Sequence, residues 1–150
     1  MRVIIQRVKE ASVSVRSDIV GKIGNGLLVL AGFESADTED DLLWMAGKIV
    51  RMRIFEDDNG VMNRSVCDVS GEILAVSQFT LYASIKKGNR PSWSRAAAGD
   101  LSKPLFERFV NILESEFGKA VETGIFGADM EIALINNGPV TISIDSRLPE

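Results

Sequence analysis

Two short runs of apolar residues constrain the fold of this chain more than any other feature of its sequence. They cover residues 27–33 and 73–76. A short apolar run bounded by turn residues is typical of a buried β-strand. Residues 2–9 alternate in part between polar and apolar, and residues 11–15 alternate strictly, which predicts two further strands. The chain is therefore expected to build a β-sheet.

Two later segments have the spacing of amphipathic helices. The first helix is predicted over residues 38–52, with Asp37 as its N-cap and acidic residues in its first turn. These acidic residues are more typical of a helix start than of a metal site. The second helix is expected to begin with an N-cap at Asp100 or Ser102 and to end before Gly118.

The remaining segments complete an α/β pattern. Turn residues at 21–26 separate two predicted strands, and extended segments at 130–135 and 142–144 lie near the end of the sequence. No repeat or linker divides the chain. Residues 1–150 are therefore expected to form one compact α/β domain, in which residues 145–150 are a loose tail.

The composition bears on the location of the protein. The chain has 150 residues and a single cysteine, Cys67, which excludes an internal disulfide and fits a reducing compartment. No apolar run approaches the roughly 20 residues that cross a bilayer. The first residues also lack the anatomy of a signal peptide. We therefore expect a cytosolic protein without membrane association.

The absence of histidine limits the chemistry that the chain can perform. It excludes Ser-His-Asp and Cys-His catalysis and removes the usual general base near neutral pH. It also removes the commonest zinc ligand, so we expect no metal site and no cofactor. The 21 acidic and 17 basic residues give a net charge of −4. Any nucleic acid would therefore be held over a small patch.

The apolar run at 73–76 leads directly into four residues with side chains suited to a site: Ser77, Gln78, Phe79 and Thr80. A strand end that becomes polar without a turn suggests a site carried on a rigid element. The alternative is an ordinary central strand whose polar residues bond to neighbouring loops.

The segment 84–98 has no clear periodicity and carries four basic residues without an acidic one: Lys86, Lys87, Arg90 and Arg95. Trp93 lies between the last two. Cations with an aromatic side chain suit a short stretch of single-stranded nucleic acid. A solvated loop with Trp93 packed against the body of the protein is the alternative.

Two motifs carry a resemblance to a known family. They are S-Q-F-T-L at 77–81 and N-N-G-P-V-T at 136–141, and together they closely resemble the D-aminoacyl-tRNA deacylase family of the bacterial and eukaryotic type. The likeness covers nearly the whole chain, including I-Q-R-V at 5–8 and R-P-S at 90–92. Either motif alone is weak, but both in this order and at this spacing make the assignment specific.

The resemblance implies a three-layer α/β/β fold in which mixed β-sheets pack with two main helices. It implies a homodimer with active sites at the subunit interface, in which Gly138 and Pro139 form a cis peptide inserted into the partner's pocket. The implied substrate is the aminoacylated 3′ end of a tRNA that carries a D-amino acid. The implied reaction is hydrolysis of the ester at the terminal adenosine, and glycyl-tRNA is also accepted within the family.

The residues of the first motif fit this chemistry. An aminoacyl ester is already activated, so its hydrolysis needs oxyanion stabilisation and a placed water more than a strong nucleophile. Backbone N–H groups around Gln78, Phe79 and Thr80 are candidate donors. Thr80 is the candidate nucleophile, but no neighbouring residue of the motif would activate it. We therefore favour a water that the ribose 2′-hydroxyl positions or activates, with Thr80 holding the geometry.

The second motif suggests how chirality is read. Pro139 has no N–H and Gly138 has no side chain, so the dipeptide presents carbonyl oxygens at close range. Two fixed carbonyls would hold the substrate ammonium group and crowd the face on which an L side chain projects. Arg7 either braces this loop or is an ordinary strand-edge charge. By family position Phe126 and Met130 would enclose the terminal adenine, although taken alone both fit a core.

Three positions depart from the family pattern: Asn137 stands where aspartate is usual, and Tyr82 and Trp93 are bulkier than expected.

Two other functions stay open. One is a non-catalytic RNA-binding module that holds a 3′ end, and the other is a structural dimerisation domain. Release of tyrosine only from the D form of tyrosyl-tRNA would identify the enzyme.

Overall fold

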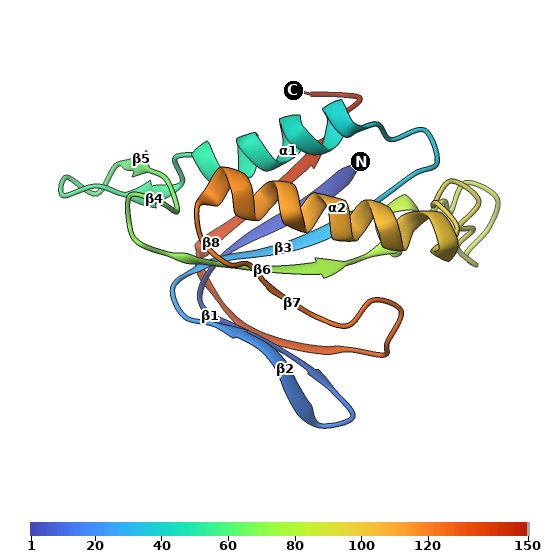
Figure 1. The fold of residues 1–150 in the computed structure, drawn as a ribbon, viewed down its shortest axis with the longest axis horizontal. Coiled ribbons are helices and arrows are strands. Elements are labelled where there is room, and N and C mark those ends of the chain that lie inside the picture. The colour runs from blue at the N-terminus through green and yellow to red at the C-terminus, as the bar shows by residue number, and fades with distance from the viewer. Residues whose placement is uncertain (150) are drawn as a thin grey trace.

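The computed structural model describes residues 1–149 and shows two helices side by side on one face of a curved sheet (Figure 1). The elements, in chain order, are β1 (Arg2–Val15), β2 (Asp18–Ile23), β3 (Gly26–Gly32), α1 (Glu39–Arg51), β4 (Phe55–Glu56), β5 (Met62–Arg64), β6 (Glu72–Ser77), the 3₁₀ helix η1 (Phe79–Tyr82), α2 (Gly99–Phe117), β7 (Glu122–Thr123) and β8 (Glu131–Asp145). The predicted α/β class with two main helices is confirmed.

The main sheet is mixed. Its strand order is β2-β1-β3-β6-β7, and β8 pairs with β1. β3, β6 and β7 are parallel to one another, whereas β1 is antiparallel to β2, β3 and β8. β4 and β5 form a separate two-stranded sheet. No helix within residues 1–149 has the length and apolar character needed to cross a membrane.

The two apolar runs are continuous because both faces of their strands are buried. In β6, Ile73 and Ala75 pack in the core beneath the helices, whereas Leu74 and Val76 pack in a second cluster on the opposite face. Val8 and Val13 of β1 belong to that second cluster. Since successive side chains point to opposite faces of a strand, a strand between two cores must be apolar throughout. Figure 1 shows the resulting layers: helices, central strands, and the lower part of β1 with β2 and β8.

Both helices begin at different residues from those predicted. α1 is capped by Thr38, which forms a reciprocal capping box with Asp41. Asp37 instead accepts a hydrogen bond from the N-terminal ammonium group at 2.5 Å. α2 begins after Ala98, whose carbonyl accepts from the backbone N–H of Ser102 at 2.8 Å, so neither Asp100 nor Ser102 is its N-cap. α2 ends as predicted before Gly118, which has a left-handed φ of 73°.

Three strands differ in length or position from the segments that the sequence predicted. β1 is one strand of 14 residues rather than two, and it remains paired with β8 along most of its length. β2 occupies part of the segment 21–26 that was predicted to be a turn. β8 likewise runs through the Asn-Gly-Pro segment as one strand.

The prediction of a loose tail over residues 145–150 is wrong for the first residues of that segment. The Ser146 hydroxyl accepts from the N-terminal ammonium group at 2.7 Å and donates to Asp41 at 2.8 Å. Arg147 forms an ion pair with Glu34 at 2.8 Å. These long-range contacts fix the end of β8 beside α1. Residue 150, the last of the predicted tail, lies outside the described residues.

Candidate active site

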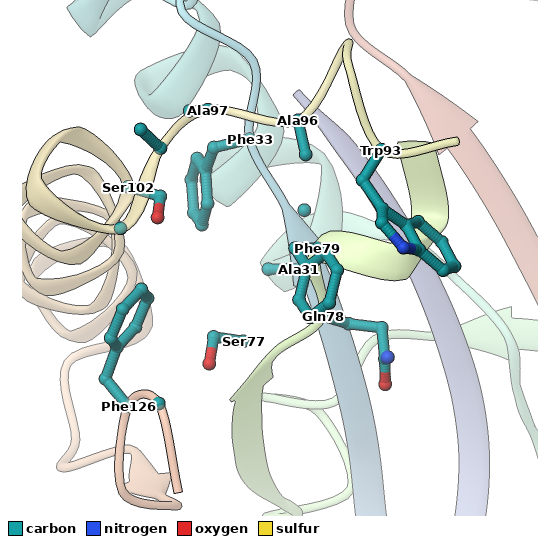
Figure 2. A pocket seen from close by; sticks show the side chains of 14 residues that line it. Ala31, Phe33, Ser77, Gln78, Phe79, Trp93, Ala96, Ala97, Ser102 and Phe126 are labelled. Carbon is teal, nitrogen blue, oxygen red and sulfur yellow. The ribbon is translucent and has the colours of Figure 1, made fainter. Parts of the chain in front are cut away.

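A cavity of about 390 Å³ opens where β3 and β6 end against the start of α2 (Figure 2). It is lined by residues 31–33 and 77–79, by the segment between Trp93 and Ser102, and by Phe126 and Gly127. β3 and β6 are parallel, so both present their carboxyl ends here. Ligands in α/β sheets commonly bind outside the carboxyl ends of the strands. The position and the lining make this cavity the candidate active site.

The S-Q-F-T-L motif does not lie on a strand beyond its first residue. β6 ends at Ser77, and the chain then forms η1, in which Leu81 donates to the Gln78 carbonyl at 3.3 Å. The Gln78 N–H donates to the Ala31 carbonyl at 2.7 Å and is therefore not free for a substrate. The N–H groups of Phe79 and Thr80, the first two of η1, have no hydrogen-bond partner within residues 1–149. Only these two of the three candidate donors are available.

The side chains of the motif divide into two groups. Those of Ser77, Gln78 and Phe79 line the cavity, whereas Thr80 does not. The Thr80 hydroxyl instead accepts a hydrogen bond from the side-chain amide of Gln78. An amide donor cannot remove the hydroxyl proton, so this contact positions Thr80 without activating it as a nucleophile.

Tyr82 anchors the end of η1 in the body of the protein. Its side chain is buried, and the guanidinium groups of Arg2 and Arg95 lie 4.7 and 5.6 Å from its ring centroid. Its hydroxyl has no hydrogen-bond partner in the described part of the chain. Burial, with nearby carboxylates such as that of Asp37, raises the pKa of this hydroxyl well above its usual value. Tyr82 is therefore a neutral support for the motif.

The orphaned hydroxyl predicts that Tyr82→Phe stabilises the protein. A buried polar group without a partner costs about 1–3 kcal/mol, and phenylalanine removes it while keeping the ring under both arginines. We expect the free energy of unfolding, measured in urea, to rise by about 1 kcal/mol. Tyr82→Leu, which also loses the ring, is expected to lower it. A loss of stability in Tyr82→Phe would show that the hydroxyl has a partner such as a bound water.

Arg7 is buried beside the Gly138–Pro139 segment rather than exposed at a strand edge. Only 5% of it is accessible, and it donates from Nε to the Asn137 carbonyl at 3.0 Å and from Nη1 to the Ile54 carbonyl at 2.5 Å. The Gly138–Pro139 bond is cis, and Gly138 has a φ of 127°. A Cβ at Gly138 would lie 2.9 Å from Nη2 of Arg7. Arg7 therefore holds this segment of β8 in close contact.

The two motifs lie apart within one chain. Gly138 and Pro139 are exposed and do not line the cavity. β8 and β6 are separated by β1 and β3, which amounts to three strand spacings of about 4.8 Å. Ser77 is level with Val3 of β1, whereas Gly138 lies beside Arg7, four residues further along. At about 3.3 Å per residue, the motifs are roughly 20 Å apart.

Of the two residues predicted to enclose the adenine, Phe126 lines the cavity and Met130 does not. Phe126 lines the cavity and lies 6.1 Å from Phe106, measured between ring centroids. Met130 does not line the cavity. It packs against the second core cluster, and a Cβ added at Gly124 would lie 2.5 Å from the Met130 sulfur. Ser102 lines the cavity but was expected only as a helix cap, because nothing in its sequence context indicated a site.

The basic segment 84–98 passes the mouth of the cavity. Lys86, Lys87 and Arg90 are exposed and make no ion pair within residues 1–149, whereas Arg95 lies 3.7 Å from Glu34. Trp93 packs edge-to-face on Phe79 with 5.3 Å between ring centroids, yet 40% of Trp93 remains accessible. Trp93 thus joins the basic segment to the S-Q-F-T-L motif.

Comparison with known proteins finds relatives along the whole chain. A family model described as D-Tyr-tRNA(Tyr) deacylase matches residues 4–145. A D-aminoacyl-tRNA deacylase of Dechloromonas aromatica is 71% identical over 150 residues, and the alignment covers 100% of both chains. A D-aminoacyl-tRNA deacylase of Chromobacterium violaceum is 59% identical, again with 100% of both chains covered.

Solved structures show the same architecture. The c-Myc DNA Unwinding Element Binding Protein superposes with a TM-score of 0.92 at 37% identity, covering 97% of this chain and 98% of that chain. A probable eukaryotic D-amino acid tRNA deacylase has a TM-score of 0.82 at 21% identity, with 95% and 97% covered, which supports the fold alone. This chain belongs to the D-aminoacyl-tRNA deacylase family, a family of hydrolases, as its two motifs predicted.

Proposed function

We propose that this protein hydrolyses the ester that joins a D-amino acid to the terminal adenosine of tRNA, and so proofreads chirality in translation in the cytosol. The free amino acid and the intact tRNA are the products. One observation carries the proposal beyond family membership: the N–H groups of Phe79 and Thr80 have no partner within residues 1–149 and belong to the motif at the cavity. Two fixed donors of this kind suit the oxyanion of ester hydrolysis.

The proposed reaction needs no charged side chain. The ester carbonyl oxygen accepts hydrogen bonds from the Phe79 and Thr80 N–H groups, and water adds to the carbonyl carbon. The tetrahedral intermediate then breaks its bond to the ribose oxygen, which leaves with a proton. The ribose 2′-hydroxyl positions or activates the water, because no histidine is present and Thr80 is held by Gln78. The Gln78 amide orients the ester.

We further propose a homodimer in which each site is completed by the partner's Gly138–Pro139. The separation of about 20 Å within one chain supports this arrangement, since the exposed dipeptide cannot reach its own cavity. Residues 137–140 also have no counterpart in the β1–β8 register, so their carbonyl groups are not committed to that ladder. Two such carbonyls would hold the substrate ammonium group and exclude an L side chain. Glycine, without a side chain, would be hydrolysed as well.

The three exposed cations Lys86, Lys87 and Arg90 would contact phosphates of the acceptor end. The same cations favour the alternative function, an RNA-binding module without turnover. Purified protein incubated with D- and L-tyrosyl-tRNA separates the two: release of tyrosine from the D form alone supports the enzyme, and binding without release supports the module.

The role of Thr80 can be tested by replacing it with valine. If Thr80 only positions Gln78, losing this hydrogen bond of about 1 kcal/mol should lower kcat for D-tyrosyl-tRNA by about 5–10-fold. Thr80→Ser keeps the hydroxyl and is the control. Complete loss of turnover in folded Thr80→Val, with turnover retained in Thr80→Ser, would identify Thr80 as the nucleophile. A tRNA ending in 2′-deoxyadenosine should be hydrolysed far more slowly by the unmodified protein.

A further inference from the structure

Ser102 is a buried residue at the cavity whose hydroxyl the proposed reaction does not use. Besides Tyr82, three polar or charged residues of the described chain are buried: Arg7, Ser65 and Ser102. Arg7 donates to two carbonyls and Ser65 bonds to Asp68, but the Ser102 hydroxyl has no hydrogen-bond partner within residues 1–149. Only 7% of Ser102 is accessible, and it lines the cavity. Figure 2 shows its hydroxyl pointing from α2 toward the side of the cavity that carries Phe126.

The helix itself gives no reason for a hydroxyl at this position. A buried serine in a helix commonly bonds to the carbonyl four residues earlier. Here that carbonyl, of Ala98, accepts instead from the backbone N–H groups of Leu101 and Ser102 at 3.0 and 2.8 Å. Alanine would fill the same space with a better helix propensity and without an unpaired polar group. The only partner open to the hydroxyl is therefore whatever occupies the cavity, either solvent or a ligand.

The walls around Ser102 indicate the shape of that ligand. Phe106, one turn further along α2, lies 6.4 Å from Phe33 and 6.1 Å from Phe126 between ring centroids. Phe33 and Phe126 both line the cavity. A cavity with aromatic walls and few polar groups suits a flat heteroaromatic ligand whose edge carries donors and acceptors. The terminal base of the proposed substrate is such a group.

We propose that the Ser102 hydroxyl hydrogen-bonds the edge of the terminal adenine, so that Ser102 is a specificity residue for the base rather than for the amino acid. The proposal rests on the function proposed above. It assigns the end of the cavity at Phe33 and Phe126 to the nucleoside and leaves the end at Phe79 to the ester.

The kinetic test pairs Ser102→Ala with changes in the terminal base. The substrates are D-tyrosyl-tRNAs ending in adenosine, purine riboside, 1-deazaadenosine, 3-deazaadenosine or 7-deazaadenosine. Ser102→Ala is expected to lower kcat/KM about 5–20-fold on adenosine, the range for one buried hydrogen bond. One analogue lacks the atom or group of the base that Ser102 bonds. On that analogue, kcat/KM of the variant and of the unchanged protein should differ by less than 2-fold. D-alanyl-tRNA should show the same penalty as D-tyrosyl-tRNA.

Two outcomes would overturn the proposal: a penalty that is equal on all five bases, and a penalty that changes with the amino acid instead. Ser115→Ala, at an exposed position of the same helix, is the matched control and should leave kcat/KM unchanged. Ser102→Cys, which keeps the size but donates weakly, should behave like Ser102→Ala. Because the hydroxyl has no partner within residues 1–149, Ser102→Ala should be at least as stable as the unchanged protein.

A binding measurement separates this proposal from the function on which it rests. The probe is the non-hydrolysable amide of D-tyrosine with 3′-amino-3′-deoxyadenosine, titrated by calorimetry. Ser102→Ala is expected to bind this probe about 5–20-fold more weakly than the unchanged protein does. The two proteins should bind equally a probe whose purine or deaza base lacks the bonded atom or group. This pair of results supports the role of Ser102 even if no hydrolysis is observed. Equal binding to both proteins overturns it even if D-tyrosyl-tRNA is hydrolysed.

Discussion

Replacing Gly138 with alanine is expected to lower kcat/KM for D-tyrosyl-tRNA by about 100-fold or more. Gly138 has a φ of 127°, a conformation that side chains disfavour. Its new Cβ would lie 2.9 Å from both Nη2 of Arg7 and Cγ2 of Val140. The segment or these two side chains must therefore shift, and a shift of about 1 Å in a positioning group can cost about 100-fold in rate. Steady-state hydrolysis of D-tyrosyl-tRNA measures the effect.

The matched control is Gly60→Ala. Gly60 also has a positive φ, of 74°, but a Cβ there meets nothing within 4 Å. It is expected to keep its activity and to lose only a small amount of stability. Thermal unfolding of both variants separates a local shift from global unfolding. Full activity in a folded Gly138→Ala protein would show that Gly138–Pro139 does not contact the substrate.

Removing the backbone N–H of Phe79 should have an effect of similar size. Incorporating phenyllactic acid at position 79 replaces this N–H with an ester oxygen and keeps the phenyl side chain. If the N–H stabilises the oxyanion, kcat for D-tyrosyl-tRNA should fall about 100–1000-fold, the usual cost of losing one such donor. KM should change little, because the developing charge exists only in the transition state.

The control for the backbone change is the corresponding hydroxy acid at the exposed residue Ile85, which should leave kcat unchanged. The N–H of Phe79 has no partner within residues 1–149, so its loss should not destabilise the fold. A rise in KM with kcat unchanged would assign this N–H to substrate binding and would contradict its role with the oxyanion.

The sequence predicts the central strands well because a strand buried on both faces is a continuous run of apolar residues. It predicts β2 poorly because Gly21 was taken as a turn residue. In the structure Gly21 lies within a strand, and a Cβ there would be 2.7 Å from the Thr123 carbonyl. The glycine permits a close approach to β7, a contact between residues about 100 positions apart in the sequence. The end of β8 is likewise fixed by distant partners, as the Arg147–Glu34 pair shows.

The site follows a similar pattern. Ser77, Gln78 and Phe79 line the cavity and were recognisable from their place after an apolar strand. The bend into η1 had no local signature: the Gln78 N–H bonds to the Ala31 carbonyl, and the Phe79 and Thr80 N–H groups have no partner within residues 1–149. No local signature indicated that Ser102 lines the cavity or that Met130 does not. Which face of a short segment meets the cavity is decided by packing, not by residue type.

The most direct test of the proposed activity is tyrosine release from matched D- and L-tyrosyl-tRNA by the purified protein. We expect rapid release from the D form, and release from the L form no faster than its spontaneous hydrolysis. The proposed reading of chirality also predicts release of glycine from glycyl-tRNA. Equal release from the D and L forms, or release from neither, would contradict it.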